Sequence, residues 1–273
     1  MFNQTAYALG ANRSCIRELF EYGRSRAAIV GPENVYDYSL GNPSIPSPKG
    51  VNDAIRDILL DTPSLLVHGY TSATGDLEAR KAISRDLNTR YGADTKPEEF
   101  FLGCGAAPEL CSVFRALSVP GGELIAVAPY FPEYRPFAQE AGLQFKVVPP
   151  DVPDFQISLP RLEALITPHT QAVLINTPNN PSGVVYTRET LQELAALLTR
   201  KAEHYGHPIY LISDEPYREL AYGVEVPFVP GIYRDTLICY SYSKSLSLPG
   251  ERIGYVYVPQ AATDGKALYA AVA

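Results

Sequence analysis

The stretch CYSYSKSLSLPGERIGYVYV, residues 239–258, places a single lysine, Lys244, among serines and eight residues before Arg252. Taken alone, a lysine is most often a solvated surface residue. A lysine that is desolvated near other cations, however, loses its proton readily, and its amine can then act as a nucleophile or a base. Serine hydroxyls and a guanidinium suit a phosphate group. These residue types could therefore supply a reactive amine and an anion site.

Other polar residues follow apolar runs elsewhere in the chain. AVLIN runs into TPNNPSG, which contains Asn180; YLIS ends at Asp214, with Tyr217 shortly after; FFLGCG ends at Gly105. Each of these residues, taken singly, has an ordinary reading as a helix cap or a turn residue. Ligands of parallel sheets bind beyond the carboxyl ends of the strands, so we expect these groups to meet at one edge of one sheet.

Strands and helices must alternate to bring these residues together. The predicted strands are 98–105, 123–129, 143–149, 171–178, 208–213 and 236–241, and the predicted helices are 13–28, 75–91, 106–118, 132–142, 159–166 and 187–206. This alternation predicts an α/β fold, with a mostly parallel sheet and helices on both faces. The connector at 40–50 is dense in Pro, Gly and Ser, so a boundary is expected near residue 50.

Composition excludes several classes of function. Hydrophobic residues make up 46% and charged residues 19%, which indicates a globular chain. The net charge of -7 comes without any basic run, so no nucleic-acid partner is expected. No stretch approaches the roughly 20 apolar residues of a membrane span, and the N-terminus lacks a signal pattern, so we expect a cytoplasmic protein that does not enter a membrane. The cysteines lack metal-ligand spacing, which predicts reduced thiols and neither a metal nor a disulfide. They are Cys15, Cys104, Cys111 and Cys239.

Three strings, INTPNNPSG, ISDEPYREL and SYSKSLSLPGERIGY, occur in this order. Together they closely resemble the motifs of the class I and II aminotransferases, which are pyridoxal-phosphate enzymes of fold type I. The resemblance runs from about Gly41 to Tyr257. It implies an enzyme that moves an amino group from an L-amino acid to a 2-oxo acid, with pyridoxal 5′-phosphate as cofactor.

The resemblance implies a role for each residue that matches a motif. Lys244 matches the lysine that forms a Schiff base with the cofactor aldehyde and later moves the proton of the substrate α-carbon. Asp214 matches the carboxylate that keeps the pyridine nitrogen protonated. Tyr217 and Asn180 match the phenol and amide that hydrogen-bond the ring oxygen O3′, and Asn180 is also expected at the substrate.

Further positions extend the resemblance to the cofactor phosphate and to a second subunit. The implied phosphate donors are the backbone amides of Gly105, Ala106 and Ala107 at a helix start and the side chains of Ser241, Ser243 and Arg252. Phe131 matches the aromatic residue that stacks on the cofactor ring. Tyr70 matches a tyrosine that reaches the phosphate of the neighbouring subunit, which implies a homodimer with shared active sites, and Gly41 matches a loop glycine at the substrate.

The chain is expected to divide into two parts at the connector near residue 50. Residues 1–50 are expected to form an N-terminal helical arm and connector, and residues 51–273 the large cofactor-binding domain. The family continues into a small C-terminal domain, so the chain is expected to be truncated inside a connecting helix. No arginine for the substrate carboxylate is therefore nominated.

Three alternatives stay open at this point. Ser241 and Lys244 also fit the Ser-x-x-Lys pattern of serine acyl hydrolases, but this motif should open a helix, whereas here it follows a predicted strand, and no Lys-Thr-Gly element accompanies it. A pyridoxal-phosphate C–S lyase or related eliminase would use the same lysine, aspartate and phosphate donors. A non-catalytic, aminotransferase-like sensor domain could keep the cofactor residues without turnover.

Overall fold

The computed structural model describes residue 2, residues 4–11 and residues 15–273. The chain divides into two compact units, Met1–Pro46 and Ser47–Ala273. Among the described residues, no helix is both long enough and apolar enough to cross a membrane.

The first unit is helical. It contains α1 (Gln4–Ala11) and α2 (Cys15–Val30), followed by a short 3₁₀ turn at Pro32–Asn34. α2 covers most of the predicted helix 13–28, whose first two residues lie outside the described part of the chain. The assignment of residues 1–50 to an arm and connector stays a prediction.

The second unit is built on one seven-stranded sheet with the order β1-β7-β6-β5-β4-β2-β3. The strands are β1 (Phe100–Gly103), β2 (Glu123–Val127), β3 (Gln144–Val148), β4 (Thr170–Asn176), β5 (Tyr210–Asp214), β6 (Thr236–Ser241) and β7 (Gly254–Tyr257). β2, β3, β4, β5 and β6 pair in parallel, whereas β7 pairs antiparallel with both β1 and β6. The predicted mostly parallel sheet is therefore confirmed.

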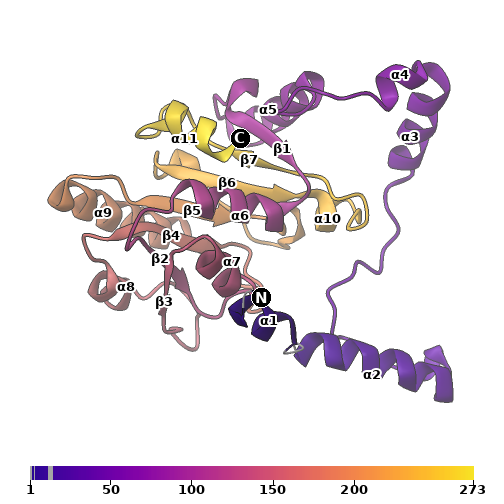
Figure 1. Cartoon of the computed structure of the whole chain (residues 1–273), viewed down its shortest axis with the longest axis horizontal. Coiled ribbons are helices and arrows are strands. Elements are labelled where there is room, and N and C mark those ends of the chain that lie inside the picture. The colour runs from indigo at the N-terminus through magenta and orange to yellow at the C-terminus, as the bar shows by residue number, and fades with distance from the viewer. Residues whose placement is uncertain (1, 3, 12–14) are drawn as a thin grey trace. The chain divides into compact units, whose positions relative to one another are not determined.

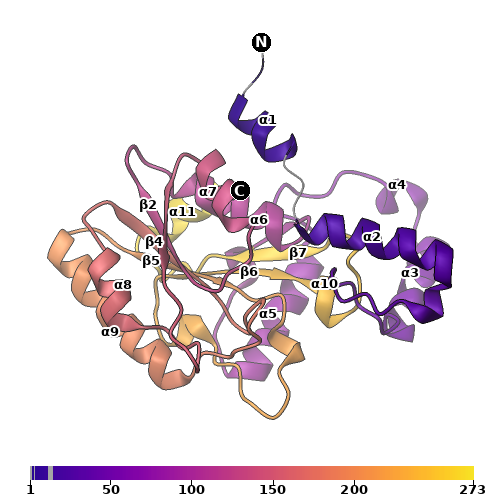
Figure 2. The same ribbon diagram turned by 90° about the horizontal axis from the view of Figure 1, so that it is seen from below.

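Helices cover both faces of this sheet. The helices of the second unit are α3 (Lys49–Asp61), α4 (Ser64–Val67), α5 (Leu77–Tyr91), α6 (Ala106–Ala116), α7 (Tyr134–Glu140), α8 (Leu159–Leu165), α9 (Arg188–Tyr205), α10 (Tyr242–Ser245) and α11 (Gly265–Val272). Figures 1 and 2 show α6, α7 and α11 on one side of the strands and α5, α8 and α9 on the other.

Alternation along the strands explains the two covered faces. Leu124 and Ala126 of β2 pack with α6 and α7, whereas Ile125 and Val127 pack with α8 and α9. Successive side chains of a strand point to opposite faces, so strands that are buried on both sides read as continuous apolar runs. The sequence therefore predicted these strands from their apolar runs.

Local signals set the ends of the longer helices. The Asp76 side chain accepts a hydrogen bond from Ala79 N at 2.9 Å and caps α5, which ends at Gly92 with a φ of 62°. A side-chain oxygen at this position satisfies one of the free amides of the first turn, and glycine tolerates the left-handed conformation at the end. Both ends agree with the predicted helix 75–91 to within two residues.

The sequence analysis missed several elements. It assigned no helix to α3 or α4, and none of the residues of these two helices is buried. It also missed β7, which lies between β1 and β6 in the sheet. β7 begins at Gly254, which is in register with Ser241 of β6 and with Gly103 of β1. Because β7 runs in the opposite direction, its start lies at the carboxyl edge of the other strands, which brings the preceding Arg252 to that edge.

Candidate active site

The carboxyl ends of the central strands form the floor of the site. Asn176 at the end of β4 is in register with Asp214 at the end of β5, and Asp214 is in register with Cys239 of β6, two residues before Ser241. The strand pairing thus brings these polar residues together at one edge of the sheet, as predicted.

A cavity of about 140 Å³ lies at this edge. It is lined by Ala106, Ala107, Leu110, Phe131, Tyr134, Asn176, Asn180, Asp214, Pro216, Tyr217, Ser241, Ser243, Lys244 and Arg252. The lining includes every predicted site residue except Gly41, Gly105 and Tyr70.

Each of these three residues is described by its own position. Gly105 is the N-cap of α6, directly before the lining residue Ala106. Tyr70 belongs to the second unit and is fully exposed. Gly41 belongs to the first unit, and its expected role at the substrate stays a prediction.

The start of α6 forms an anion-binding corner. Gly105 has a φ of 96°, which favours glycine, and a Cβ there would lie 2.7 Å from Nη2 of Arg252, so a larger residue would also push the guanidinium away. The Arg252 guanidinium donates to the carbonyl of Pro249 at 3.0 Å and to Oγ of Ser243 at 3.4 Å. The free amides at the start of a helix favour an anion, and the guanidinium reinforces this preference.

The two serines are organised by the end of β6. The Ser241 hydroxyl accepts from the amide of Ser243 at 3.1 Å and thereby caps α10, while it donates to Oγ of Ser243 at 2.6 Å. The Ser-x-x-Lys motif therefore does open a short helix. The sequence analysis argued against a serine hydrolase because the motif was not expected to open a helix, and that part of the argument was wrong. A nucleophilic serine must donate its proton to a base within hydrogen-bond reach, whereas the Ser241 hydroxyl donates to the hydroxyl of Ser243. Ser241 is therefore poorly placed to act as a nucleophile.

Asp214 is a buried carboxyl group with an unusual environment. Tyr134 donates its phenol proton to Oδ2, while Oδ1 has no hydrogen-bond partner within the described part of the chain. Burial raises the pKa of Asp214 from 3.8 to about 7, against the opposing effect of the Tyr134 hydrogen bond. The group is therefore suited to accept a charged partner at Oδ1, because a cation there would restore its ionised form.

Lys244 lies in α10 and is partly buried. Burial lowers the pKa of its ammonium group, because desolvation disfavours the charged form. A larger share of the amine is then unprotonated, and thus nucleophilic, at neutral pH. This shift agrees in direction with the chemistry that the sequence predicted for this lysine.

Tyr217 and Asn180 are joined by a side-chain hydrogen bond, which opposes the rise that burial causes in the pKa of the Tyr217 phenol. The Asn180 loop is itself held in place, because its backbone amide donates to Oδ1 of Asn176 at 2.5 Å. The amide nitrogen of Asn176 donates in turn to the backbone carbonyl of Asp214 at 2.8 Å. Asn176 thus ties the loop of Asn180 to the strand of Asp214.

The sequence analysis missed three polar residues of the site: Asn176, Tyr134 and Glu109. Asn176 ends β4 as Asp214 ends β5, so its position at a strand end was a usable signal. Tyr134 lies in a helix, and nothing in the local sequence indicated that its phenol would bond to Asp214, which is 80 residues further along the chain. Glu109 looked like an ordinary acidic residue in the first turn of a helix, yet it is buried and neither carboxylate oxygen has a hydrogen-bond partner among the described residues.

Comparison with known proteins identifies the family. The model of the aminotransferase class I and II family matches residues 33–271. The chain belongs to this family. An aspartate aminotransferase of Thermotoga maritima is 34% identical over 85% of the chain, and an aspartate/prephenate aminotransferase of Thermus thermophilus is 33% identical over 81%. The chain spans 60% and 55% of the lengths of these two relatives.

Solved structures of aminotransferases have the same fold. The crystal structure of an amino transferase from Eubacterium rectale is 54% identical, with a TM-score of 0.97, and the alignment covers all of this chain and 69% of that one. The aspartate aminotransferase of Thermus thermophilus with maleate is 27% identical, with a TM-score of 0.84 and 66% of its chain covered. The predicted fold type I is therefore confirmed for this aminotransferase-family chain.

Members of this family depend on pyridoxal 5′-phosphate, and the cavity fits this cofactor. The unpartnered Oδ1 of Asp214 can accept a hydrogen bond from a protonated ring nitrogen. The glycine turn at Gly105, with Arg252 against it, can receive a phosphate dianion. Lys244 supplies a primary amine for the aldehyde, and Phe131 supplies an aromatic face. The roles of the individual residues in holding the cofactor stay predictions.

Proposed function

We propose that the complete protein is a pyridoxal-phosphate-dependent aminotransferase, which moves an amino group from an L-amino acid to a 2-oxo acid. The observation that carries this proposal is that one cavity is lined by Lys244, by Asp214 with its unpartnered oxygen, and by the anion corner of α6 and Arg252. Relatives named as aspartate and aspartate/prephenate aminotransferases make amino dicarboxylic acids the first donors to test.

The proposed roles follow from the chemistry of each side chain. The bound cofactor supplies a conjugated ring that accepts electrons from the substrate α-carbon. Lys244 Nζ would bind the cofactor aldehyde covalently, with loss of water, and as a free amine it would accept the proton of that carbon. Asp214 Oδ1 accepts a hydrogen bond from the ring nitrogen and keeps it protonated. Tyr217 and Asn180 donate hydrogen bonds to the ring oxygen, and Asn180 also contacts the substrate.

The first test is covalent loading of the protein with pyridoxal phosphate. Loaded protein should show a visible absorption band that borohydride abolishes, and the reduced cofactor should appear on the peptide that contains Lys244. Lys266, which is exposed on α11, provides the matched control: Lys266→Ala should load normally and Lys244→Ala should not. A saturated protein without the band, or with the label on other lysines, contradicts the proposal.

The second test measures turnover. Amino acid is added with and without a 2-oxo acid, and the keto product and ammonia are both quantified. Transfer of the amino group to the 2-oxo acid without release of ammonia supports aminotransferase activity. Release of ammonia independently of the 2-oxo acid would instead identify an eliminase.

We also propose that the protein acts as a homodimer with shared sites, in which Tyr70 serves the phosphate of the neighbouring subunit. The surface around Tyr70 supports this, because α3, α4 and the following segment expose large apolar side chains, as a surface made for another chain does. These side chains are Ile55, Ile58, Leu59, Leu60, Leu65, Leu66 and Tyr70.

Mixed subunits test the shared site. Tyr70→Ala and Lys244→Ala should each be inactive, yet their mixture should regain partial activity, since one site of a mixed dimer carries neither substitution. Sedimentation of the wild-type protein should show a dimer. A monomer, or a mixture without activity, contradicts the shared site.

We further propose that the protein works in the cytoplasm. The described thiols support this location: Cys15 and Cys104 are exposed, and Cys111 and Cys239 are also unpaired. Exposed thiols persist in a reducing compartment. Fractionation of cells that express the tagged full-length protein tests the proposal, which fails if the protein is recovered outside the cytoplasm.

A further inference from the structure

A second polar network lies beneath the active site, on the opposite face of the sheet. Cys239 and Val256 pack toward α6 and α7, whereas Tyr240 and Tyr255 pack toward α5. By the same alternation, the residues that flank Asp214 and Ser241 along the chain face α5, away from the cavity.

One arm of this network begins next to Asp214. The Glu215 carboxylate accepts from Oγ of Ser213 at 2.6 Å and from Nε of Arg218 at 2.7 Å. Nη1 of Arg218 donates to the phenol of Tyr255 at 3.1 Å. The side chains of Glu215 and Arg218 are only 1% and 3% exposed. A buried ion pair of this kind adds little stability over apolar packing, but it permits few alternative geometries.

The other arm begins next to Lys244. The Tyr240 phenol donates to Oε2 of Glu219 at 2.7 Å and lies 2.8 Å from Oγ of Ser245. A phenol has one proton, and Glu219 accepts it, so the Ser245 hydroxyl is the donor in the second bond. Burial raises the pKa of Tyr240 far above its ordinary value, so this arrangement persists across physiological pH.

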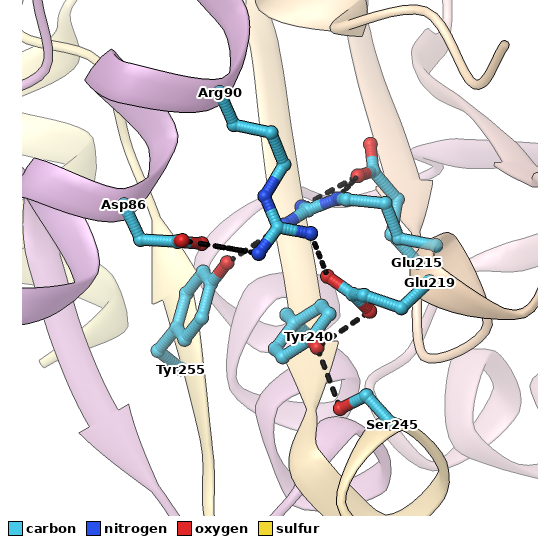
Figure 3. A network of polar contacts seen from close by, with 8 residues as sticks. Asp86, Arg90, Glu215, Glu219, Tyr240, Ser245 and Tyr255 are labelled. Atoms are coloured by element: carbon cyan, nitrogen blue, oxygen red, sulfur yellow. Dashed lines mark hydrogen bonds and ion pairs between the residues drawn. The ribbon is translucent and has the colours of Figure 1, made fainter.

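Arg218 joins the two arms. Its guanidinium lies over the ring of Tyr240, with Cζ 4.7 Å from the ring centroid. Figure 3 shows Tyr240 between Glu219 and Ser245, with Arg90 of α5 bonded to Glu219 on the outer side. The ring of Tyr240 is therefore fixed by the buried ion pair, and its hydroxyl is aimed at Ser245.

We propose that Tyr240 is a positioning residue for Lys244, acting through Ser245 and held in place by Arg218. The inference rests on the proposed function, in which Lys244 is the reactive amine. α10 has only four residues, and a helix this short is not stable by itself. The hydrogen bond from Ser245 to Tyr240 ties this turn to β6 and to the underside of the sheet, and it thereby limits where the neighbouring Lys244 amine can lie.

Tyr240→Phe is the first test, because it removes the hydroxyl and keeps the ring beneath Arg218. On mixing cofactor-free protein with pyridoxal phosphate, the visible band should form about tenfold more slowly, the effect expected for the loss of one positioning hydrogen bond. Ser245→Ala removes the donor of the same bond and should slow the reaction equally. The double variant should be no slower than either single variant, because both act through one contact.

Tyr242→Phe is the matched control. Tyr242 lies beside Tyr240, with ring centroids 5.1 Å apart, and its hydroxyl has no hydrogen-bond partner in the described ranges. This variant should form the band at a rate within about twofold of the wild type, since it breaks no such bond. Equal slowing by Tyr242→Phe would mean that general packing, and not the Ser245 contact, sets the rate, and would overturn the proposal.

A second measurement needs no cofactor. The rate of acetylation of Lys244 by acetic anhydride is followed by peptide mass spectrometry as a function of pH, with exposed Lys266 as internal reference. Asp214, Tyr217 and Arg252 line the same cavity and are unchanged in every variant. Tyr240→Phe and Ser245→Ala should move the pH midpoint of Lys244 upward, because the loosened turn lets water reach the amine.

The two measurements separate the two proposals. If the midpoint shifts in both variants but wild-type protein forms no band with pyridoxal phosphate, the proposed function fails and the positioning role stands. If band formation and the acetylation midpoint in both variants match the wild type, the positioning role is overturned, whatever the activity of the protein.

Discussion

Asp214 should make the cofactor-free protein less stable as pH rises. Its side chain is buried, Oδ1 lacks a partner among the described residues, and its pKa is raised from 3.8 to about 7. Between these pH values the folded protein keeps a proton that the unfolded chain releases. The stability associated with this proton is fully present below pH 4 and is lost as pH rises through 7.

The size of this effect follows from the shift. A difference of about three pKa units corresponds to about 4 kcal/mol in the free energy of unfolding between pH 4 and pH 8. Asp214→Asn removes the ionisation, and its amide oxygen can still accept from Tyr134. We therefore expect the cofactor-free variant to be about 2–4 kcal/mol more stable than the wild type at pH 8, and close to it at pH 4.

Urea denaturation of the two cofactor-free proteins at both pH values measures the difference. Asp154→Asn is the matched control, because it removes the same charge from an exposed loop. Loaded with cofactor, Asp214→Asn should slow removal of the substrate proton about 10³-fold, as loss of an electrostatic catalytic group does. If Asp214→Asn gained no stability at pH 8 relative to pH 4, the carboxyl would not be desolvated and the reasoning would be wrong.

Two further predictions concern the anion corner. Arg252→Lys should raise the dissociation constant of pyridoxal phosphate about tenfold, because an ammonium cannot reproduce the paired donors of the guanidinium. The affinity for pyridoxal, which has no phosphate, should be unchanged. Equal weakening of both affinities, measured by fluorescence titration, would contradict a phosphate contact. Burial and the charge of Asp214 raise the pKa of Glu109 to about 9. As pH rises from 8 to 10, this carboxyl therefore gains a negative charge beside the phosphate. The affinity of the wild type for pyridoxal phosphate should fall over this range relative to the affinity of Glu109→Gln. A constant ratio of the two affinities across this range would show that Glu109 does not ionise there.

The sequence predicted the parallel strands and their polar ends well, for a physical reason. Strands buried on both faces are continuous apolar runs, and the first polar residue after such a run marks the end of the strand. Asp214 and Ser241 were found in this way, and the motif resemblance added their expected roles. Asn176 could have been found by the same rule.

What the sequence did not reveal depends on contacts between distant segments. The run that forms β7 has no local sign of its direction, so the arrival of Arg252 at the site through an antiparallel strand could not be read from the pattern. Tyr134 and Asp214 are 80 residues apart, and neither neighbourhood indicates the other. The burial of Glu109 likewise depends on Gly103 and Gly254, because a side chain at either position would occupy the space of the Glu109 carboxylate.

The place of β7 between β1 and β6 has a consequence for the order of folding. The hairpin of β6 and β7 brings Ser241, Lys244 and Arg252 together through contacts that are local in sequence. The anion corner also needs Gly105, which reaches Arg252 only when β1 pairs with β7 across about 150 residues of chain, and such long-range closure is slow. During synthesis on the ribosome, the part of the site that contains Ser241, Lys244 and Arg252 can therefore form as soon as β7 emerges. The anion corner forms later, when β1 pairs with β7. Pyridoxal phosphate present during synthesis would contact both Gly105 and Arg252, and it would thereby stabilise the pairing of β1 with β7.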